Sequence, residues 1–577
     1  MILKNIRIKE ETMRKKGLGV FVIVLAAIFC FAAGKTVQEG GFDILIKNGK
    51  IINGTGNPWY YGDIGIIDDK IVEVGNLSDK EAVTVIDAEG LVVSPGFIDM
   101  HTHCDRGLGE PGSNANLNYL MQGTTTVRTG SCGSGTYKIA ETKKAWERQG
   151  IGTNAVLLVG HNPVRRAAMG EEQLRNPAPE EVEHMQELVR QAMREGAWGI
   201  STGLEYGGND KFVTTEEVIE VTKAVAEFGG VYTSHIRDEA SRILDAIKET
   251  IRIGEETGVP VNVTHIKATG KYNWGLMKDA IQLIKDARAR GFMVTADQYP
   301  FVQGAPIGSI TSLVDVPADM EPFAELRQTM RNRQLSAGER KQAQEQYVKE
   351  LQKALADSTK RELLKQSTYE KRPDNPSAVA RWGWQDFRFK VSEKNAHLVN
   401  KPFVDVIEEQ KRDGFDVIAD LIIDEPDILF AAGSQSDDDM RHAMQQEFVM
   451  VSSDGSALPP VKETDKPVLG HPRQFSSQAI ILRKYVREEN LLTLEAAIRK
   501  MTSLPAQYIK MDDRGLLLEG YKADITIFNP ETVRDNASWD DARQYATGVE
   551  YVIVNGKVSV DKGKFNGALN GKVLLKQ

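Results

Sequence analysis

The sequence predicts an α/β protein in which a closed (β/α)8 TIM-like barrel carries a small β-sandwich domain built from both ends of the chain. Three observations support this fold class. Apolar segments typical of strands alternate with amphipathic helical segments through the middle of the chain. Reactive side chains recur where these apolar segments end, as they do at the carboxyl-terminal face of such barrels. Short strand-like segments occur near both ends.

Residues 1–34 are predicted to be an export signal peptide. Basic residues precede an unbroken apolar stretch at 20–33, and Ala32, Ala33 and Gly34 supply small residues for cleavage. The apolar stretch is short for a membrane span. We therefore expect cleavage rather than a retained N-terminal anchor. The mature protein should then be periplasmic or extracellular and free of the membrane.

Charge and cysteine content exclude two classes of protein. The 577 residues carry a net charge of −9. This argues against nucleic acid as the main partner, because phosphate binding needs a basic surface. The three cysteines, Cys30, Cys104 and Cys132, are too few for a disulfide framework in a chain of this length. We expect a small-molecule partner instead.

Two β-rich segments, 35–95 and 516–577, are expected to form the β-sandwich. Asn48-Gly49 lies between short apolar runs, a pattern that favours a hairpin turn. A second turn is expected at Asp68-Asp69, and Asn555-Gly556 repeats the signal near the other end. The simplest arrangement is one sandwich assembled from both segments, with a large domain inserted between them.

Residues 96–515 are expected to form the barrel. Eight candidate strands end near His103, Gly130, Gly160, Thr202, His235, His265, Gln298 and Ser453. Amphipathic helical stretches such as 216–228 and 241–257 lie between most of them. An insertion at about 316–410 separates the last two strands. Its charged helical pattern fits a solvated helical hairpin and a lid over the barrel mouth equally well.

Four histidines and a cysteine point to a metal centre. His101 and His103 follow the first predicted strand, and residues i and i+2 of a strand share a face, so both imidazoles can reach one cation such as zinc. His235 and His265 end later strands, and Cys132 lies among glycines after the second strand. Each residue alone is more often structural, but five such donors at strand ends indicate metal ligation.

Asp454 ends the eighth predicted strand and is the candidate general base. A carboxylate there can take a proton from water and later pass it to a leaving group. The structural alternative is a helix N-cap, but the apolar strand before Asp454 favours the catalytic role. Cys104 follows His103 directly and would point to the opposite face of a continuing strand, so we expect it not to be a ligand.

Together these residues resemble the amidohydrolase superfamily, and local motifs narrow the resemblance to its N-acyl-D-amino-acid deacylase (D-aminoacylase) branch. The segments that carry it are Pro95–His103, Cys132 in its glycine-rich loop, Ser201–Tyr206, His265-Ile266-Lys267, Asp297–Pro300 and His471-Pro472-Arg473. His235 and Asp454 agree with it, and it covers about residues 42–577.

The resemblance implies a zinc-dependent barrel enzyme. Cys132, His235 and His265 would hold one tightly bound zinc ion. His101 and His103 would form a second site that is weaker or variably occupied. Many related barrels bridge two metals with a carboxylated lysine, and in this chain Cys132 takes the place of that lysine.

The resemblance also implies roles around the metal. Asp454 would be the general base and acid. Lys267, Tyr299 and Arg473 would hold the substrate carboxylate, and Tyr206 would lie near the scissile amide. A planar guanidinium binds a carboxylate through two hydrogen bonds, and an ammonium and a phenol add single donors. The structural alternatives are a surface salt bridge for Arg473 and core packing for Tyr299.

We therefore expect zinc-dependent hydrolysis of an N-acyl-D-amino acid to a D-amino acid and a carboxylate. Zinc would polarise the amide carbonyl and lower the pKa of bound water towards about 7. One alternative is a cyclic-amide hydrolase of the dihydroorotase or hydantoinase type. Another is a non-catalytic extracellular binding protein on the same fold. The residues expected to bind a free carboxylate favour an open-chain amide, and the full ligand set with Asp454 favours catalysis.

Overall fold

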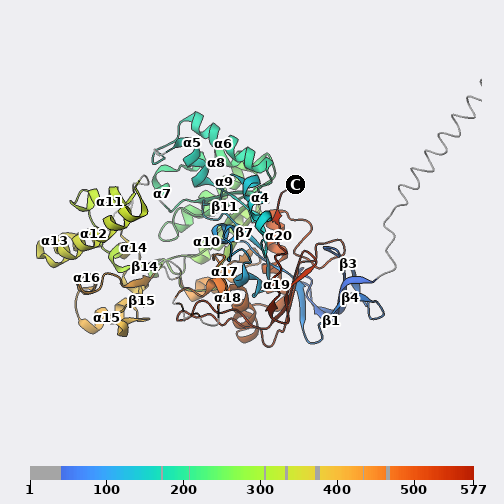
Figure 1. The fold of residues 1–577 in the computed structure, drawn as a ribbon. Coiled ribbons are helices and arrows are strands. Elements are labelled where there is room, and N and C mark those ends of the chain that lie inside the picture. Colours follow the sequence, from blue (N-terminus) through green and yellow to red (C-terminus); the bar gives the residue numbers. More distant parts are fainter. Residues whose placement is uncertain are drawn as a thin grey trace, which may run out of the picture.

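The computed structural model describes residues 41–170, 173–206, 208–304, 307–331, 335–370, 377–432, 435–462, 465, 468 and 470–576. The signal peptide expected at 1–34 lies outside these residues. Within them, no helix is both long enough and apolar enough to cross a bilayer. Figure 1 shows a central barrel with a β-domain on one side and a largely helical insertion on the other.

Eight parallel strands of the described chain close into the barrel. In order they are β6 (Phe97–Asp99), β7 (Thr124–Thr129), β8 (Asn154–Leu157) continued by β9 (Val159–Gly160), β10 (Gly199–Gly203), β11 (Val231–His235), β12 (Val261–Val263), β13 (Val294–Gln298) and β17 (Val449–Val451). Neighbours in this order pair in parallel. A parallel bridge between Thr102 and Gly455 joins the last strand to the first. The expected barrel is confirmed.

Helices surround the barrel and bury their apolar faces against it. They are α2 (Asp105–Gly109), α3 (Leu117–Leu120), α4 (Ile139–Gln149), α5 (His161–Met169), α6 (Pro179–Arg194), α7 (Asn209–Phe212), α8 (Thr215–Ala226), α9 (Ile243–Thr257), α10 (Met277–Ala289), α17 (Asp437–Met444), α18 (Arg473–Ile480), α19 (Leu494–Met501) and α20 (Ser503–Ile509). In α9, apolar residues at the helical spacing, such as Ile243, Ile247 and Ile251, join strand residues in one core cluster.

The β-domain joins both ends of the described chain, as expected. Its strands are β1 (Phe42–Ile51), β2 (Tyr60–Ile67), β3 (Lys70–Gly75), β4 (Ala82–Asp87), β5 (Val92–Pro95), β18 (Ile525–Phe528), β19 (Val549–Val554), β20 (Lys557–Asp561) and β21 (Lys564–Phe565). They form one hydrogen-bonded sheet, in which antiparallel pairing of β5 with β18 links the two segments. A final strand, β22 (Val573–Leu574), leaves this sheet and pairs with β8 in the barrel.

Two of the three expected turns are hairpins, and one expectation was wrong. Asp68-Asp69 joins β2 to β3, and Asn555-Gly556 joins β19 to β20. Asn48-Gly49 instead lies inside β1, where the register against β2 shifts between Ile46 and Gly49. Asn48 has a positive φ of 60°, and its backbone N–H donates to Asp63. The Asn-Gly signal here marks a bulge, which needs the same left-handed backbone as a hairpin turn.

The insertion between β13 and β17 is a compact unit with its own core. It contains β14 (Ile307–Ser309), α11 (Phe323–Arg331), α12 (Ala337–Ala356), α13 (Ser358–Tyr369), α14 (Ala378–Trp382), β15 (Arg388–Val391), α15 (Phe403–Gln410), α16 (Gly414–Asp424) and β16 (Leu429–Ala431). The three strands form an antiparallel sheet, and Leu351, Phe389 and Ile418 belong to its apolar cluster. The unit is more than a solvated hairpin, and it extends past both expected limits.

Candidate metal centre

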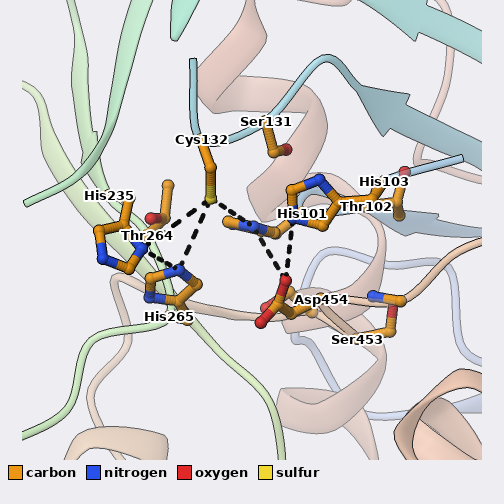
Figure 2. Close-up of polar contacts among 12 residues, drawn as sticks. His101, Thr102, His103, Ser131, Cys132, His235, Thr264, His265, Ser453 and Asp454 are labelled. Carbon is orange, nitrogen blue, oxygen red and sulfur yellow. Dashed lines mark hydrogen bonds and ion pairs between the residues drawn. The ribbon is translucent and has the colours of Figure 1, made fainter. Parts of the chain in front are cut away.

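The five expected metal ligands meet at the carboxyl-terminal mouth of the barrel (Figure 2). His101 and His103 follow β6, Cys132 follows β7, His235 ends β11 and His265 follows β12. Cys132 groups with His101 and His103, and also with His235 and His265, with the donor atoms of each group within 4.8 Å of one another. The fold thus brings residues that are far apart in sequence to one point.

Cys132, His235 and His265 have the donor set and spacing of a zinc site. Cys132 Sγ lies 4.0 Å from His235 Nδ1 and 3.8 Å from His265 Nε2, and the two nitrogens are 2.9 Å apart. Tetrahedral bonds of about 2.3 Å to sulfur and 2.0 Å to nitrogen require S–N distances of about 3.5 Å and an N–N distance of about 3.3 Å. The three residues reach that geometry through small side-chain shifts, so they fit zinc.

The backbone is strained where three of the candidate residues stand. Cys132, His265 and Asp454 all adopt positive φ, at 52°, 33° and 51°. Such conformations cost non-glycine residues on the order of 1–3 kcal/mol and persist only where the surroundings hold them. Strain of this kind clusters at active sites, and here it occurs where the chain turns out of a barrel strand.

The cluster is electrostatically suited to a cation. Burial alone would raise the pKa of the Cys132 thiol, but His101 and the other imidazoles hold it well below its ordinary value. Burial lowers the pKa of His235, yet Glu239 and Cys132 raise it to about 10. Asp454 and Cys132 likewise raise the pKa of His103 to about 9, against the effect of burial. The thiolate and carboxylates thus hold protons on the imidazoles, and the same anions attract a divalent metal, which takes the place of those protons.

Two carboxylates that were not assigned from the sequence hold the imidazoles from behind. Glu205 Oε2 lies 3.1 Å from His235 Nε2, and Glu239 Oε1 lies 2.8 Å from His265 Nδ1. In each ring the other nitrogen faces Cys132. A carboxylate on the far nitrogen fixes the tautomer and makes the near nitrogen a better metal ligand.

Asp297 is a third carboxylate behind the centre. Its Oδ1 accepts a hydrogen bond from the backbone N–H of His265 at 3.0 Å and lies 3.6 Å from Nδ1 of His101. Asp297 and Glu205 both fall within the sequence motifs that carried the family resemblance, so those motifs could have identified them. Glu239 belongs to none of those motifs.

Asp454 lies between the imidazoles and a guanidinium. Its Oδ1 is 3.1 Å from His103 Nε2 and 3.4 Å from His101 Nε2, and its Oδ2 accepts from Arg473 Nη1 at 2.6 Å. Burial raises the pKa of this carboxyl, but Arg473 and the two histidines hold it well below its ordinary value. The side chain is therefore an ionised carboxylate, as a general base must be.

The residues expected to bind the substrate carboxylate lie around one phenol. The Tyr299 ring is buried, with Lys267 Nζ 5.6 Å and Arg473 Cζ 5.5 Å from its centroid. Lys267 Nζ also lies 2.5 Å from Glu239 Oε1, so its charge is already paired. The structure brings the three residues together, and their contact with substrate stays a prediction.

Tyr206 lies against a candidate metal ligand, whereas Cys104 lies apart from the metal cluster. Tyr206 is half exposed, and its ring centroid is 4.1 Å from that of His235, at the open side of the cluster. Cys104 is fully buried with its Sγ beside Asn116, and burial raises its pKa to about 12. Cys104 therefore stays protonated and belongs to no candidate metal group of the described residues.

Comparisons with known proteins point to the same chemistry. The amidohydrolase family profile matches residues 84–358 and 469–560. D-aminoacylase of Alcaligenes xylosoxydans xylosoxydans is 31% identical, over 93% of this chain and 98% of its own length. A solved D-aminoacylase studied for its binuclear metal centre superposes with a TM-score of 0.69 at 28% identity, covering 93% of this chain and all of the other. A Bordetella bronchiseptica N-acyl-D-glutamate deacylase with zinc and a phosphonate inhibitor gives 0.68 at 27%, with the same coverage.

A more distant likeness concerns the fold alone. A D-hydantoinase structure superposes with a TM-score of 0.52 at 17% identity, covering 93% of this chain. Identity this low shows a shared architecture and does not extend to the reaction.

Proposed function

This chain belongs to the amidohydrolase family, and from that premise we propose that it hydrolyses the amide bond of N-acyl-D-amino acids, releasing a D-amino acid and a carboxylate. The observation that carries the proposal is the meeting of Cys132, His235, His265 and Asp454 at one barrel mouth. The relatives named D-aminoacylase and N-acyl-D-glutamate deacylase support the same substrate class.

Zinc is the cofactor, and the donor groups suggest how the chain holds it. Cys132, His235 and His265 would form the tight site, and His101 and His103 would share Cys132 in a second, weaker site. When bound, zinc polarises the amide carbonyl and lowers the pKa of water beside it.

Asp454 would move the proton. Its Oδ2 is held by Arg473, so Oδ1, which faces His101 and His103, is the oxygen free to receive a proton from the attacking water. The same oxygen would then give the proton to the departing amide nitrogen. Arg473 keeps the carboxylate ionised between turnovers, because its cation lowers the pKa of Asp454.

Arg473, Tyr299 and Lys267 would orient the substrate through its α-carboxylate. Their two cations flank the Tyr299 ring beside the metal centre. Each cation is also paired with a carboxylate of the site, Lys267 with Glu239 and Arg473 with Asp454, so the substrate carboxylate would be an additional partner. Tyr206, at the open side of the cluster, would contact the scissile amide. A set of donors that binds a free carboxylate favours an open-chain N-acyl amino acid over a cyclic amide, which has none at this position.

A stereochemically paired panel tests the proposal. The zinc-loaded protein is incubated with N-acetyl-D- and N-acetyl-L-amino acids and with hydantoins, and the released amine or ring-opened product is measured. We expect turnover of D substrates at least tenfold faster than their L partners, and none of hydantoins. Turnover of hydantoins alone would establish the cyclic-amide alternative. If no amide is hydrolysed, the remaining alternative is the non-catalytic binding protein.

We also propose that the protein is exported, on the strength of the basic and apolar segments within residues 1–34. Expression of the full chain, followed by cell fractionation and N-terminal mass determination, tests this. Export predicts a periplasmic or extracellular product that starts near residue 35. A full-length product confined to the cytoplasm would contradict it.

A further inference from the structure

A cavity outside the metal centre lies where the barrel, the insertion and the β-domain meet. Its volume is about 450 Å³, within the range of small-molecule sites. Four segments bound it: the loop after β13, strand β15 of the insertion, the segment at Asn400 before α15, and the loop between β18 and β19. The described lining residues are Phe301, Val302, Gln303, Arg388, Lys390, Asn400, Ser538, Trp539 and Asp540.

One histidine separates this cavity from the pair formed by Asp454 and Arg473. His471 Nδ1 accepts from the backbone N–H of Arg473 at 3.1 Å, so its Nε2 carries the proton and donates to the carbonyl of Gln303 at 2.8 Å. Its ring lies 4.4 Å from that of Trp539. Burial and the Arg473 cation hold the pKa of His471 well below its ordinary value, so the ring is neutral. His471 therefore connects the cavity wall at Trp539 to Arg473 at the metal centre.

Lys390 is a buried ammonium that forms no ion pair with a described residue. The residue is only 3% exposed, and its Nζ lies 3.3 Å from Asn400 Oδ1 and 4.3 Å from the centroid of Trp539. In the described part of the chain, no carboxylate pairs with Lys390 or Arg388. Asp540 instead accepts a hydrogen bond from Asn400 Nδ2 at 2.8 Å.

An unpaired buried charge is costly and needs compensation. Burial and the Arg388 cation lower the pKa of Lys390 to about 8 against the opposing effect of the Asp540 carboxylate, so the ammonium still dominates at neutral pH. The register of β15 against β16 shifts at Lys390, between Phe389 and Val391, and the side chains of Arg388 and Lys390 both line the cavity. The lining thus carries two cations against the single carboxylate of Asp540, and an anion would balance the excess positive charge.

We propose that this cavity is an anion subsite that binds a second carboxylate of the substrate, carried on the D-residue beyond the α-carboxylate. The inference rests on the proposed function and names its substrate class: N-acyl-D-amino acids with an acidic side chain. Lys390 and Arg388 supply the charge, and the rings of Phe301 and Trp539 pack against the aliphatic part of that side chain. The insertion thereby determines specificity.

Hydrolysis of matched substrates tests the subsite. Zinc-loaded protein is assayed with the N-acetyl derivatives of D-aspartate, D-glutamate and D-2-aminoadipate, each beside its side-chain amide. We expect kcat/KM for the best acid to exceed that of its amide at least tenfold. Lys390→Met should remove that preference through KM, with less than a twofold change for the amide. Lys394→Met, an exposed lysine of the insertion paired with Asp424, is the matched control and should change neither.

Two further measurements keep the test decisive. Thermal melting checks that Lys390→Met is folded, and Lys390→Arg should restore the preference for acids. Calorimetry with glutarate and its monoamide measures anion binding without turnover, and Lys390→Met should weaken glutarate binding at least tenfold. Equal kcat/KM for acids and amides in the wild type, or an equal loss of both in Lys390→Met, would overturn the proposal.

The calorimetric arm separates this inference from the proposed function. If no N-acyl-D-amino acid is hydrolysed, the proposed function fails, while glutarate binding that depends on Lys390 still supports the anion subsite. The absence of such binding would overturn the subsite as well. Binding that depends on Lys390, combined with equal hydrolysis of acids and amides, would assign the cavity to a separate small anion and overturn its role as a substrate subsite.

Discussion

Glu239 Oε1 lies 2.8 Å from Nδ1 of His265, and the opposite nitrogen of that ring faces Cys132 Sγ at 3.8 Å. The contact favours a proton on Nδ1, from which Lys267 Nζ also lies 2.9 Å, and leaves the Nε2 lone pair for a metal. Glu205 has the same role for His235, where the carboxylate contacts Nε2 and Nδ1 faces Cys132. The centre is therefore built in two layers, thiolate and imidazoles in front and carboxylates behind.

Glu239→Gln should weaken zinc affinity by about 10–100-fold, because loss of the carboxylate charge makes His265 a poorer ligand. Competition with a coloured zinc chelator measures the affinity. Glu256→Gln, on α9 and exposed in an ion pair with Arg252, is the matched control and should bind zinc like the wild type. Equal affinity in Glu239→Gln and the wild type would contradict a supporting role for Glu239.

Cys132→Ala should lose the tightly bound zinc, because it removes the thiolate shared by both candidate groups. Zinc content after dialysis, measured by elemental analysis, checks this. Cys104→Ala should retain zinc, since Cys104 is buried away from the cluster and its thiol stays protonated. Unchanged zinc in Cys132→Ala would remove Cys132 from the ligand set.

Asp454→Asn should reduce kcat by about 10²–10⁴-fold while zinc stays bound, because the amide cannot accept the proton of the attacking water. Parallel measurement of kcat and zinc content separates a lost base from a lost metal. A variant that holds zinc and turns over at the wild-type rate would show that another group moves the proton.

Arg473→Met should move the acid limb of the pH profile to higher pH. Asp454 must be ionised to act as base, and Arg473 helps to hold its pKa well below the ordinary value. Without the guanidinium, the effect of burial is less opposed and the pKa of Asp454 rises. Asp454 then becomes protonated, and activity is lost, at a higher pH. Zinc content is measured at each pH, because protonated ligands also release metal. An unshifted limb with zinc retained would contradict this coupling.

Much of the barrel was predictable from local pattern, and its supporting contacts were not. His235 and His265 could be placed because apolar strands end at them, and parallel strands of a barrel bring such ends together. Glu239 could not be assigned, because its position depends on how the loop after β11 folds over His265. Asn48 was wrongly assigned to a hairpin turn for a related reason. A residue with left-handed backbone fits both a bulge and a turn, and only the pairing with the partner strand decides between them.

The cavity at Lys390 could not be predicted from the sequence. Its walls come from the loop at Phe301, strand β15 and the loop at Trp539, which no local pattern relates to one another. The insertion has its own apolar core, and that core positions β15 and its two cations. A charged helical pattern could suggest a hairpin or a lid, but it carried no information on this third arrangement.

Zinc K-edge X-ray absorption of the protein loaded with one equivalent of zinc tests the central claim most directly. Coordination by Cys132, His235 and His265 predicts one sulfur at about 2.3 Å and nitrogen or oxygen neighbours at about 2.0 Å. A first shell of nitrogen and oxygen alone, with no sulfur scatterer, would contradict it.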